Sequence, residues 1–403
     1  MNQHETFVLP RAERRGLRAV LSGNAPAIAG MVSVVLAYVF RTPLFSDLHN
    51  IRLTALLFLW LFGTMMACAF AVVRYAEAIA ERLGEPYGTL VLTLSMVVIE
   101  VSPLAAIMLH GENNATLARD AMFATLMIVL NGMVGAALLM GAMRYWEQEY
   151  NLAGARAFLV VIASLAVFAL ILPNYTKTAP DPSEAPMKAL LFAAITVLFY
   201  VVFVVIQTVR HRAFFAEPAG NGHGGLDYRA QERAEARRGS LGFHVAMLML
   251  TLLPIVLLAQ FLAIIVDFGI EDLDMPDALG GVLIAILVLS PEGLTAFHAA
   301  LVNQLQRAVN VCLGSALATI GLTIPAALII GLITGCKVHL GLDQVQTVLL
   351  ILTLFVSGLT FGGARTNMLQ GVVHLLPVRR LCGADLQSLN PPFETGAKAP
   401  SSG

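Results

Sequence analysis

The chain has 403 residues, of which 58% are hydrophobic and only 13% are charged, and its formal net charge is −1. Soluble domains carry roughly 25% charged residues, and the mean hydropathy here is +0.77, so the composition excludes an ordinary soluble enzyme. A nearly neutral chain also lacks the basic surface that nucleic acid requires. The lipid bilayer is therefore the predicted surrounding of this protein.

Apolar runs near the length of a spanning helix recur along the whole chain, with charges and Pro- or Gly-rich breaks between them. In chain order they cover residues 26–45, 54–76, 86–110, 119–142, 155–172, 187–208, 241–266, 278–300, 307–334 and 345–361. We expect an all-α polytopic membrane protein with about 10–11 transmembrane helices. An eleventh run, 366–378, is short before Arg379 and Arg380, and we expect it to be half-inserted or to lie on the membrane surface.

The basic residues predict the orientation of these spans. The segment 1–25 carries Arg11, Arg14, Arg15 and Arg18 and has no small-residue cleavage signal after it, so 26–45 is expected to be a retained leading helix. With the N-terminus inside, the inner segments hold 16 Lys and Arg residues and the outer segments hold 6. The N-terminus is therefore predicted to be cytoplasmic, and the polar tail 379–403 is cytoplasmic too if the last run does not cross.

Two polar segments stand out between the spans. Residues 209–240 are rich in Gly, Arg and Glu and are predicted to form a cytoplasmic linker between two halves. The second segment has five carboxylates within eleven residues and no cation: Asp267, Glu271, Asp272, Asp274 and Asp277. It is either a vestibule that concentrates cations or an ordinary solvated loop.

The sequence gives no sign of chemistry outside the spans, either from its four cysteines or from a nucleotide-binding loop. Cys68, Cys312, Cys336 and Cys382 have no paired spacing and are interpreted as small apolar side chains. No G-x-x-x-x-G-K-[ST] loop is present. We therefore expect neither an enzyme nor a cofactor, and the pattern leaves the oligomeric state open.

An internal repeat relates the two halves. An offset of 192 residues pairs Glu85 with Asp277, Gly88 with Gly280 and Glu100 with Glu292. In the following span an offset of 190 pairs Asp120 with Asn310, Thr125 with Ser315 and Gly141 with Gly331. Because Glu100 and Glu292 lie five spans apart, the two copies enter the membrane in opposite directions. The prediction is an inverted repeat of five plus five helices, 54–208 and 241–378, after one leading helix.

Glu100 and Glu292 are the predicted functional residues. A carboxylate inside a span costs at least roughly 2.5 to 3.5 kcal/mol and usually marks a site, although a protonated core glutamate is the structural alternative. We expect the pair to bind a metal cation or protons. Pro103 and Pro291 stand close to the two glutamates and are expected to interrupt their helices, freeing backbone carbonyl oxygens for the ion.

Eight neutral polar residues in neighbouring positions are candidate additional ligands, although Ser and Thr commonly bond a helix carbonyl one turn back. They are Ser95, Ser102, Thr125, Asn131, Ser290, Asn310, Ser315 and Thr319. His298 is interpreted as a packed histidine, and Asp120 as a local partner of Arg119.

The segments around these glutamates resemble the two repeats of a known superfamily. Gly84 to Gly88 with Ile99 to Ser102, and Leu289 to Leu294 with Gly314 to Thr319, are similar to the repeats of the Ca²⁺:cation antiporters, particularly the bacterial ChaA-type Ca²⁺/H⁺ (Na⁺/H⁺, K⁺/H⁺) antiporters. The Gly-Asn-x-x-Glu motif of many Ca²⁺/H⁺ exchangers is replaced here by Val97 to Glu100. The resemblance covers about 50–376 and implies a multi-pass protein of a bacterial inner membrane, with its paired glutamates at Glu100 and Glu292.

The predicted function is secondary active exchange of Ca²⁺, Na⁺ or K⁺ for protons, with the two repeats exposing one site alternately to either side. The alternatives are a cation channel, which usually needs a ring of subunits, and an antiporter whose principal ion is Na⁺ or K⁺ rather than Ca²⁺. An intramembrane aspartyl protease needs two acids that share a proton, and the use of Glu rather than Asp argues against it.

Overall fold

The computed structural model describes residues 11–45, 48–84, 87–110, 116–175, 184–216, 239–273, 278–335 and 338–387. Several predicted features lie outside these ranges. They are Glu85, Asp274, Asp277, Cys336, linker residues 217–238 and the tail from 388 onward.

The first half consists of a leading helix and five membrane-crossing elements. The elements are α1 (Arg11–Val39), α2 (Arg41–Phe45), α3 (Ile51–Leu83), α4 (Tyr87–His110), α5 (Leu117–Met127) with η1 (Ile128–Met133) and α6 (Val134–Tyr145), α7 (Leu152–Ala166) with η2 (Val167–Ile171) and η3 (Leu172–Asn174), and α8 (Glu184–Val205) with η4 (Ile206–Arg210) and η5 (Arg212–Phe215). Asn50 and Asn151 cap α3 and α7 by accepting backbone N–H groups, which satisfies donors that a helix leaves open at its start.

The second half repeats this order. Its elements are α10 (Leu241–Glu271), α11 (Ala278–Leu301), α12 (Leu305–Ala318) with η6 (Thr319–Thr323) and α13 (Ile324–Thr334), α14 (Gln344–Thr360) and α15 (Met368–Gln387). Ser240 caps α10, and Asp343 with Gln346 forms a reciprocal capping box at α14. Each of the ten predicted apolar runs is helical, and eight helices of the described ranges are long and apolar enough to cross a membrane.

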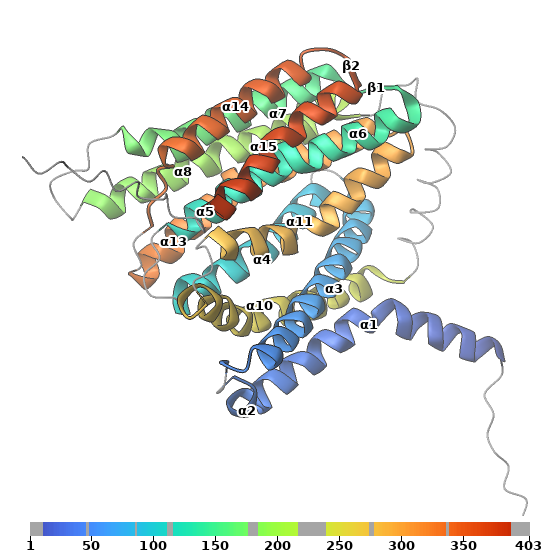
Figure 1. The fold of residues 1–403 in the computed structure, drawn as a ribbon. Helices are drawn as coiled ribbons and strands as arrows, with labels where there is room; N and C mark the ends of the chain where they lie inside the picture. The colour runs from blue at the N-terminus through green and yellow to red at the C-terminus, as the bar shows by residue number, and fades with distance from the viewer. Residues whose placement is uncertain are drawn as a thin grey trace, which may run out of the picture.

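The helices form one bundle in which α4 and α11 lie side by side in the middle (Figure 1). The leading helix α1 packs against α3 and α10 at one edge, and α14 and α15 lie toward the other (Figure 1). α4 and α11 cross the bundle in opposite directions, as the inverted repeat predicts. The sequence therefore predicted both the helical class and the relation between the halves.

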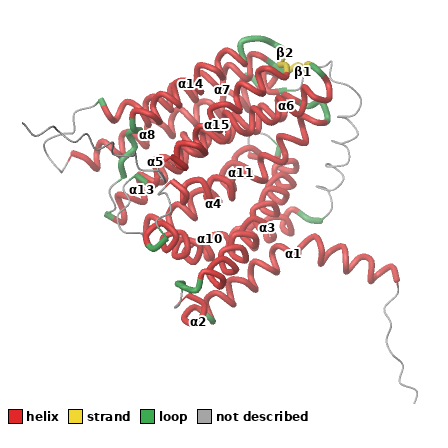
Figure 2. The backbone as a smooth tube through the Cα atoms, viewed as in Figure 1, coloured by secondary structure: helices red, strands yellow, loops and turns green. Residues whose placement is uncertain are grey.

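A two-stranded antiparallel sheet was not expected from the sequence. β1 (Glu147–Glu149) pairs with β2 (Arg365–Asn367), with Gln148 opposite Thr366, and the two strands lie together at one end of the bundle (Figure 2). Arg365 stabilises the pair through Glu149, with Nη2 at 2.6 Å from Oε1. The sheet joins the α6–α7 turn to the α14–α15 turn, and we call this end of the molecule the sheet end.

The last helix is longer than the apolar run that predicted it. The helix does not stop near Val378 but continues through Pro377 to Gln387 and has 20 residues, which corresponds to about 30 Å. It packs along α6 and η1, and its end lies near α5, across the bundle from β2 (Figure 1). Proline cannot donate a backbone hydrogen bond, but this alone does not end a helix whose neighbours hold it in place. The element therefore has the total length of a spanning helix, but its apolar part, Met368–Pro377, is shorter than a span needs, and the half-inserted or surface position stays a prediction.

Two glycines allow α15 to pack closely on α6. A Cβ atom on Gly371 would lie 2.7 Å from the Leu139 backbone nitrogen, and one on Gly135 would lie 3.0 Å from the Gly371 carbonyl oxygen. Small residues are needed where two membrane helices approach this closely. Both close neighbours are backbone atoms, so neither can rotate away.

We expect Gly371→Ala to destabilise the protein, because the new methyl group forces α15 away from α6. Overpacking of this kind costs about 1–3 kcal/mol, which should appear as a lower thermal unfolding midpoint of the detergent-purified protein. Gly358→Ala in α14 is the matched control, since a Cβ there meets nothing within 4 Å. Equal midpoints for the two variants would contradict the close approach.

Candidate functional site

The two predicted glutamates lie at the centre of the bundle, on α4 and α11. Glu100 is 7% exposed, and Glu292 is partly buried. The Glu100 carboxyl group acts electrostatically on that of Glu292. The structure therefore brings together two acids that are 192 residues apart in the sequence.

The helices that carry them are continuous, and the expected interruption at the prolines is wrong. α4 runs through Pro103 and α11 runs through Pro291 without a break. The serine before each proline bonds the carbonyl oxygen one turn back, with 2.5 Å from Ser102 Oγ to Val98 O and 2.5 Å from Ser290 Oγ to Ile286 O. These side-chain bonds reach the carbonyl oxygens next to the ones that the prolines leave without a backbone donor.

The irregular backbone lies instead in the helices opposite. The π-helical segments η1 (Ile128–Met133) and η6 (Thr319–Thr323) interrupt the α5–α6 and α12–α13 helices, and the offset of 190 residues superimposes them. A π segment inserts an extra residue into a turn, and such segments are frequent at functional sites. Here η6 turns two threonine side chains toward Glu100.

The two carboxyl groups have different surroundings. Glu100 Oε2 accepts hydrogen bonds from Thr323 Oγ1 at 2.6 Å and Thr319 Oγ1 at 3.3 Å. Glu292 accepts one from Ser315, and its buried Oε2 atom has no hydrogen-bond partner among the described residues. At the repeat positions of Thr319 and Thr323, the first half has Val129 and Met133, which cannot donate. The repeat is therefore symmetric in its backbone but not in its polar contacts.

A cavity of about 230 Å³ reaches Glu292. It lies between α4 on one side and α12 on the other, with α8 closing a third side, and its walls include Thr93, Tyr200, Asn310 and Ser315. Glu77 of α3 and Arg307 of α12 also line it, with 3.9 Å between Oε1 and Nη2. Arg307 lies at the start of α12, just after the α11–α12 turn. Gln148 of β1 donates to the Ala300 carbonyl oxygen beside this turn, so the cavity extends toward the sheet end.

The eight candidate ligands divide into three groups. Thr319 and Ser315 bond the glutamates, and Asn310 lines the cavity. Ser95, Ser102 and Ser290 bond carbonyl oxygens of their own helices, which was the alternative stated for them. The remaining two residues do not contact a glutamate in any recorded bond: Thr125 is buried on α5, and Asn131 donates to Thr353 at 2.9 Å.

Thr323 is the site residue that the sequence analysis missed. It is one turn beyond Thr319 on the same face of the predicted span 307–334, and its bond to Glu100 is the shorter of the two. The i, i+4 spacing of the two threonines was the available signal. The described residues contain no cluster of three or more His, Cys, Asp or Glu side chains that could hold a metal ion. The site instead offers two carboxylates and neutral hydroxyls, which suit a hard cation.

Comparisons with known proteins agree with this arrangement. The family model described as sodium/calcium exchanger protein matches residues 53–209 and 243–377. The chain is 40% identical over 314 residues to the protein y4hA of Sinorhizobium fredii, covering 78% of this chain and 84% of the relative. It is 36% identical over 311 residues to the sodium-potassium/proton antiporter ChaA of Escherichia coli, covering 77% and 83%.

Solved structures show the same fold. The structure of native YfkE is similar with a TM-score of 0.68 at 17% identity, covering 89% of this chain and 99% of that one. The H⁺/Ca²⁺ exchanger CAX is similar with a TM-score of 0.61 at 14% identity, covering 92% and 89%. At these identities the likeness concerns the helix arrangement, and the side chains of the site must be interpreted from this chain itself.

We expect Thr323→Val to weaken cation binding at the glutamate pair by roughly tenfold, because a hydrogen bond to a charged group contributes about 1.5–3 kcal/mol. The shape of the side chain is kept while its donor is lost. The measurement is the half-saturating cation concentration of the purified protein. Thr251→Val is the control, since Thr251 is equally buried but bonds only carbonyl oxygens of its own helix, Met247 and Leu248. An unchanged half-saturating cation concentration in Thr323→Val would show that the Thr323 hydroxyl does not contribute to cation binding.

Proposed function

Because the chain belongs to the sodium/calcium exchanger protein family, we propose that it exchanges a metal cation for protons across a membrane at Glu100 and Glu292. One observation carries this proposal: a buried and a partly buried carboxyl group lie together on oppositely directed helices, and a cavity leads to the second. Inverted-repeat transporters place their site at this position, near the middle of the membrane between the repeats.

Electrostatic repulsion accounts for the coupling of the two ions. Two charged carboxylates about 4 Å apart repel each other by roughly 4 kcal/mol at an effective dielectric constant of 20. The empty pair therefore does not persist in its doubly charged form, and it does not change sides in that form. Protons or a metal cation must neutralise it, so each ion leaves only when the other replaces it.

The cargo proposed is Na⁺, K⁺ or Ca²⁺, all of which prefer oxygen ligands. The Escherichia coli relative is a sodium-potassium/proton antiporter, and a more distant relative from Synechocystis, 23% identical, is a Ca²⁺/H⁺ antiporter. Two carboxylates balance one Ca²⁺ or one monovalent ion with a proton. The higher identity to the first relative supports Na⁺ or K⁺ as the principal cation.

The proposed location is the inner membrane of a bacterium, with the N-terminus and the sheet end in the cytoplasm. If α15 crosses, the three basic residues Arg379, Arg380 and Lys398 move to the outer count, which rises from 6 to 9 against 16 inside. The excess on the inner side remains. In this orientation the cavity that reaches Glu292 opens toward the cytoplasm.

We expect Glu100→Gln and Glu292→Gln each to abolish cation-driven proton movement, because glutamine keeps the volume but cannot hold the charge. Fluorescence of a pH dye in everted vesicles, with Na⁺, K⁺ and Ca²⁺ added in turn, measures the exchange. Glu147→Gln at the exposed sheet serves as the control and should transport normally. Near-normal exchange in either site variant would refute the two-glutamate site, and cation flux without any proton movement would favour a channel.

A cysteine at Val311 tests the side to which the cavity opens. Val311 lines the cavity, whereas its repeat counterpart Ala121 is 5% exposed. In a background without native cysteines, we expect Val311→Cys to react with an impermeant thiol reagent in everted vesicles but not in intact cells. In the conformation described, Ala121→Cys should react from neither side. Labelling of Val311→Cys in intact cells would reverse the proposed orientation.

A further inference from the structure

The open and closed sides of the site are formed by equivalent faces of two helices. On α12 the cavity is lined by Asn310, Val311, Gly314 and Ser315. The offset of 190 residues places Asp120, Ala121, Ala124 and Thr125 of α5 at the same positions. This face of α5 is buried, with Ala121 and Ala124 each 5% exposed and Thr125 3% exposed, and α5 packs against α11. The structure is therefore open along α12 and closed along α5.

The first pair differs in charge. Asn310 is neutral, whereas Asp120 is a carboxylate whose side chain is only 15% exposed. A cation that enters through the cavity along α12 passes the side-chain amide of Asn310. A cation that uses the equivalent path along α5 would meet a carboxylate.

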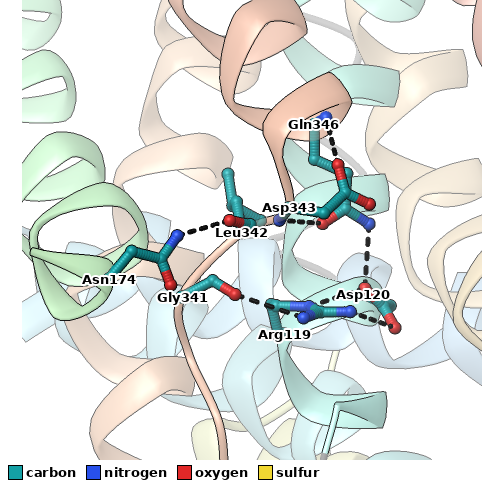
Figure 3. Close-up of polar contacts among 7 residues, drawn as sticks. All are labelled: Arg119, Asp120, Asn174, Gly341, Leu342, Asp343 and Gln346. Atoms are coloured by element: carbon teal, nitrogen blue, oxygen red, sulfur yellow. Dashed lines mark hydrogen bonds and ion pairs between the residues drawn. The ribbon is translucent and has the colours of Figure 1, made fainter.

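In the closed state, Asp120 is neutralised by its neighbour. Arg119 donates from Nε to Oδ1 at 2.9 Å and from Nη2 to Oδ2 at 3.2 Å, and Gln346 of α14 donates from Nε2 to Oδ1 at 3.0 Å. The three side chains point toward one another, as Figure 3 shows. Three hydrogen bonds fill most of the roughly four acceptor positions of a carboxylate, and the guanidinium group takes the position that a bound cation would take.

Arg119 also contacts the surface at this end. Its Nη1 donates to the Gly341 carbonyl oxygen at 3.2 Å (Figure 3), and it lines a second cavity of about 420 Å³ with Thr116, Asn174 and His339. The segment 338–343 is fixed nearby, because Asp343 caps α14 and Asn174 donates to the Leu342 carbonyl. Solvent in this cavity reaches Arg119, which lies next to Asp120.

From this arrangement we propose that Asp120 is a cation-binding residue of the access path opposite the sheet end. While that path is closed, the Arg119 guanidinium group occupies the position of the cation at Asp120. The inference rests on the proposed alternating exchange. When α5 and α11 separate, the carboxylate faces the opened path and attracts the cation on its way to the glutamate pair. Because Asn310 has no charge, the two sides of the transporter should then differ in their apparent affinity for cations.

Asp120→Asn tests the proposal when the cation is titrated separately on each side of oriented proteoliposomes. Loss of one charge at about 4 Å in water raises the half-saturating concentration about five-fold for a monovalent cation and about thirty-fold for a divalent one. We expect this rise only on the side opposite the sheet end. Asp343→Asn is the control: it is exposed in the same cluster, asparagine keeps the helix cap, and salt screens its charge, so the half-saturation stays within about two-fold.

The mirror variant Asn310→Asp keeps the test decisive if Asp120→Asn does not fold. It should lower the half-saturating cation concentration on the sheet side by about five-fold for a monovalent cation. The variant loses the Asn310 bond to the Phe215 carbonyl oxygen, and its thermal unfolding midpoint checks that this loss is tolerated. Equal changes on both sides, or a lower maximal rate alone, would make the Arg119–Asp120 pair structural and overturn the inference. If instead Glu100→Gln still exchanges ions, the proposed function itself fails.

Discussion

Two acids placed in the interior of a membrane protein cannot both remain charged and without a partner, and the rest of this structure follows from that constraint. A buried ion loses its hydration, which costs several kcal/mol even after the surroundings relax. Glu100 recovers part of this cost through Thr319 and Thr323. Glu292 recovers part through Ser315 and through the cavity at its side. Both solutions leave room for a proton or a cation, because neither places a permanent positive charge beside the carboxylates.

The two glutamates differ in access and in hydrogen-bond partners. Glu292 is reached by the cavity and has a free oxygen atom within the described structure, so an ion from the sheet end meets it first. Glu100 lies deeper and is held by two hydroxyl groups from η6. The two hydroxyl donors fix the orientation of the Glu100 carboxyl group. In the proposed exchange, this geometry favours binding at Glu292 before Glu100.

The sequence was sufficient for the features that depend on hydropathy and repetition. The apolar runs located ten helical segments, eight helices of the described residues are long and apolar enough to cross a membrane, and the offset of 192 residues paired Glu100 with Glu292. It was insufficient where packing decides. Pro103, Pro291 and Pro377 are all accommodated within helices, as membrane helices tolerate when their surroundings compensate for the lost hydrogen bond. The i, i+4 spacing of Thr319 and Thr323 was a signal that the two residues share a helix face, but π segments have no residue signature of their own, so the bonds to Glu100 could be found only in the structure. The β1–β2 pair consists of polar residues in two distant turns, which no local pattern connects.

Repetition of the backbone and divergence of the side chains have separate consequences. The superimposable π segments and the equivalent faces of α5 and α12 allow the same movement to open either side. The side chains on those faces differ, however: Val129 and Met133 stand where the other half has Thr319 and Thr323, and Asp120 stands where it has Asn310. In the proposed exchange, each state would therefore surround the cation with different partners. Because a ligand shifts a conformational equilibrium only through its different affinity for the two states, this divergence is what lets the bound ion influence which side is open.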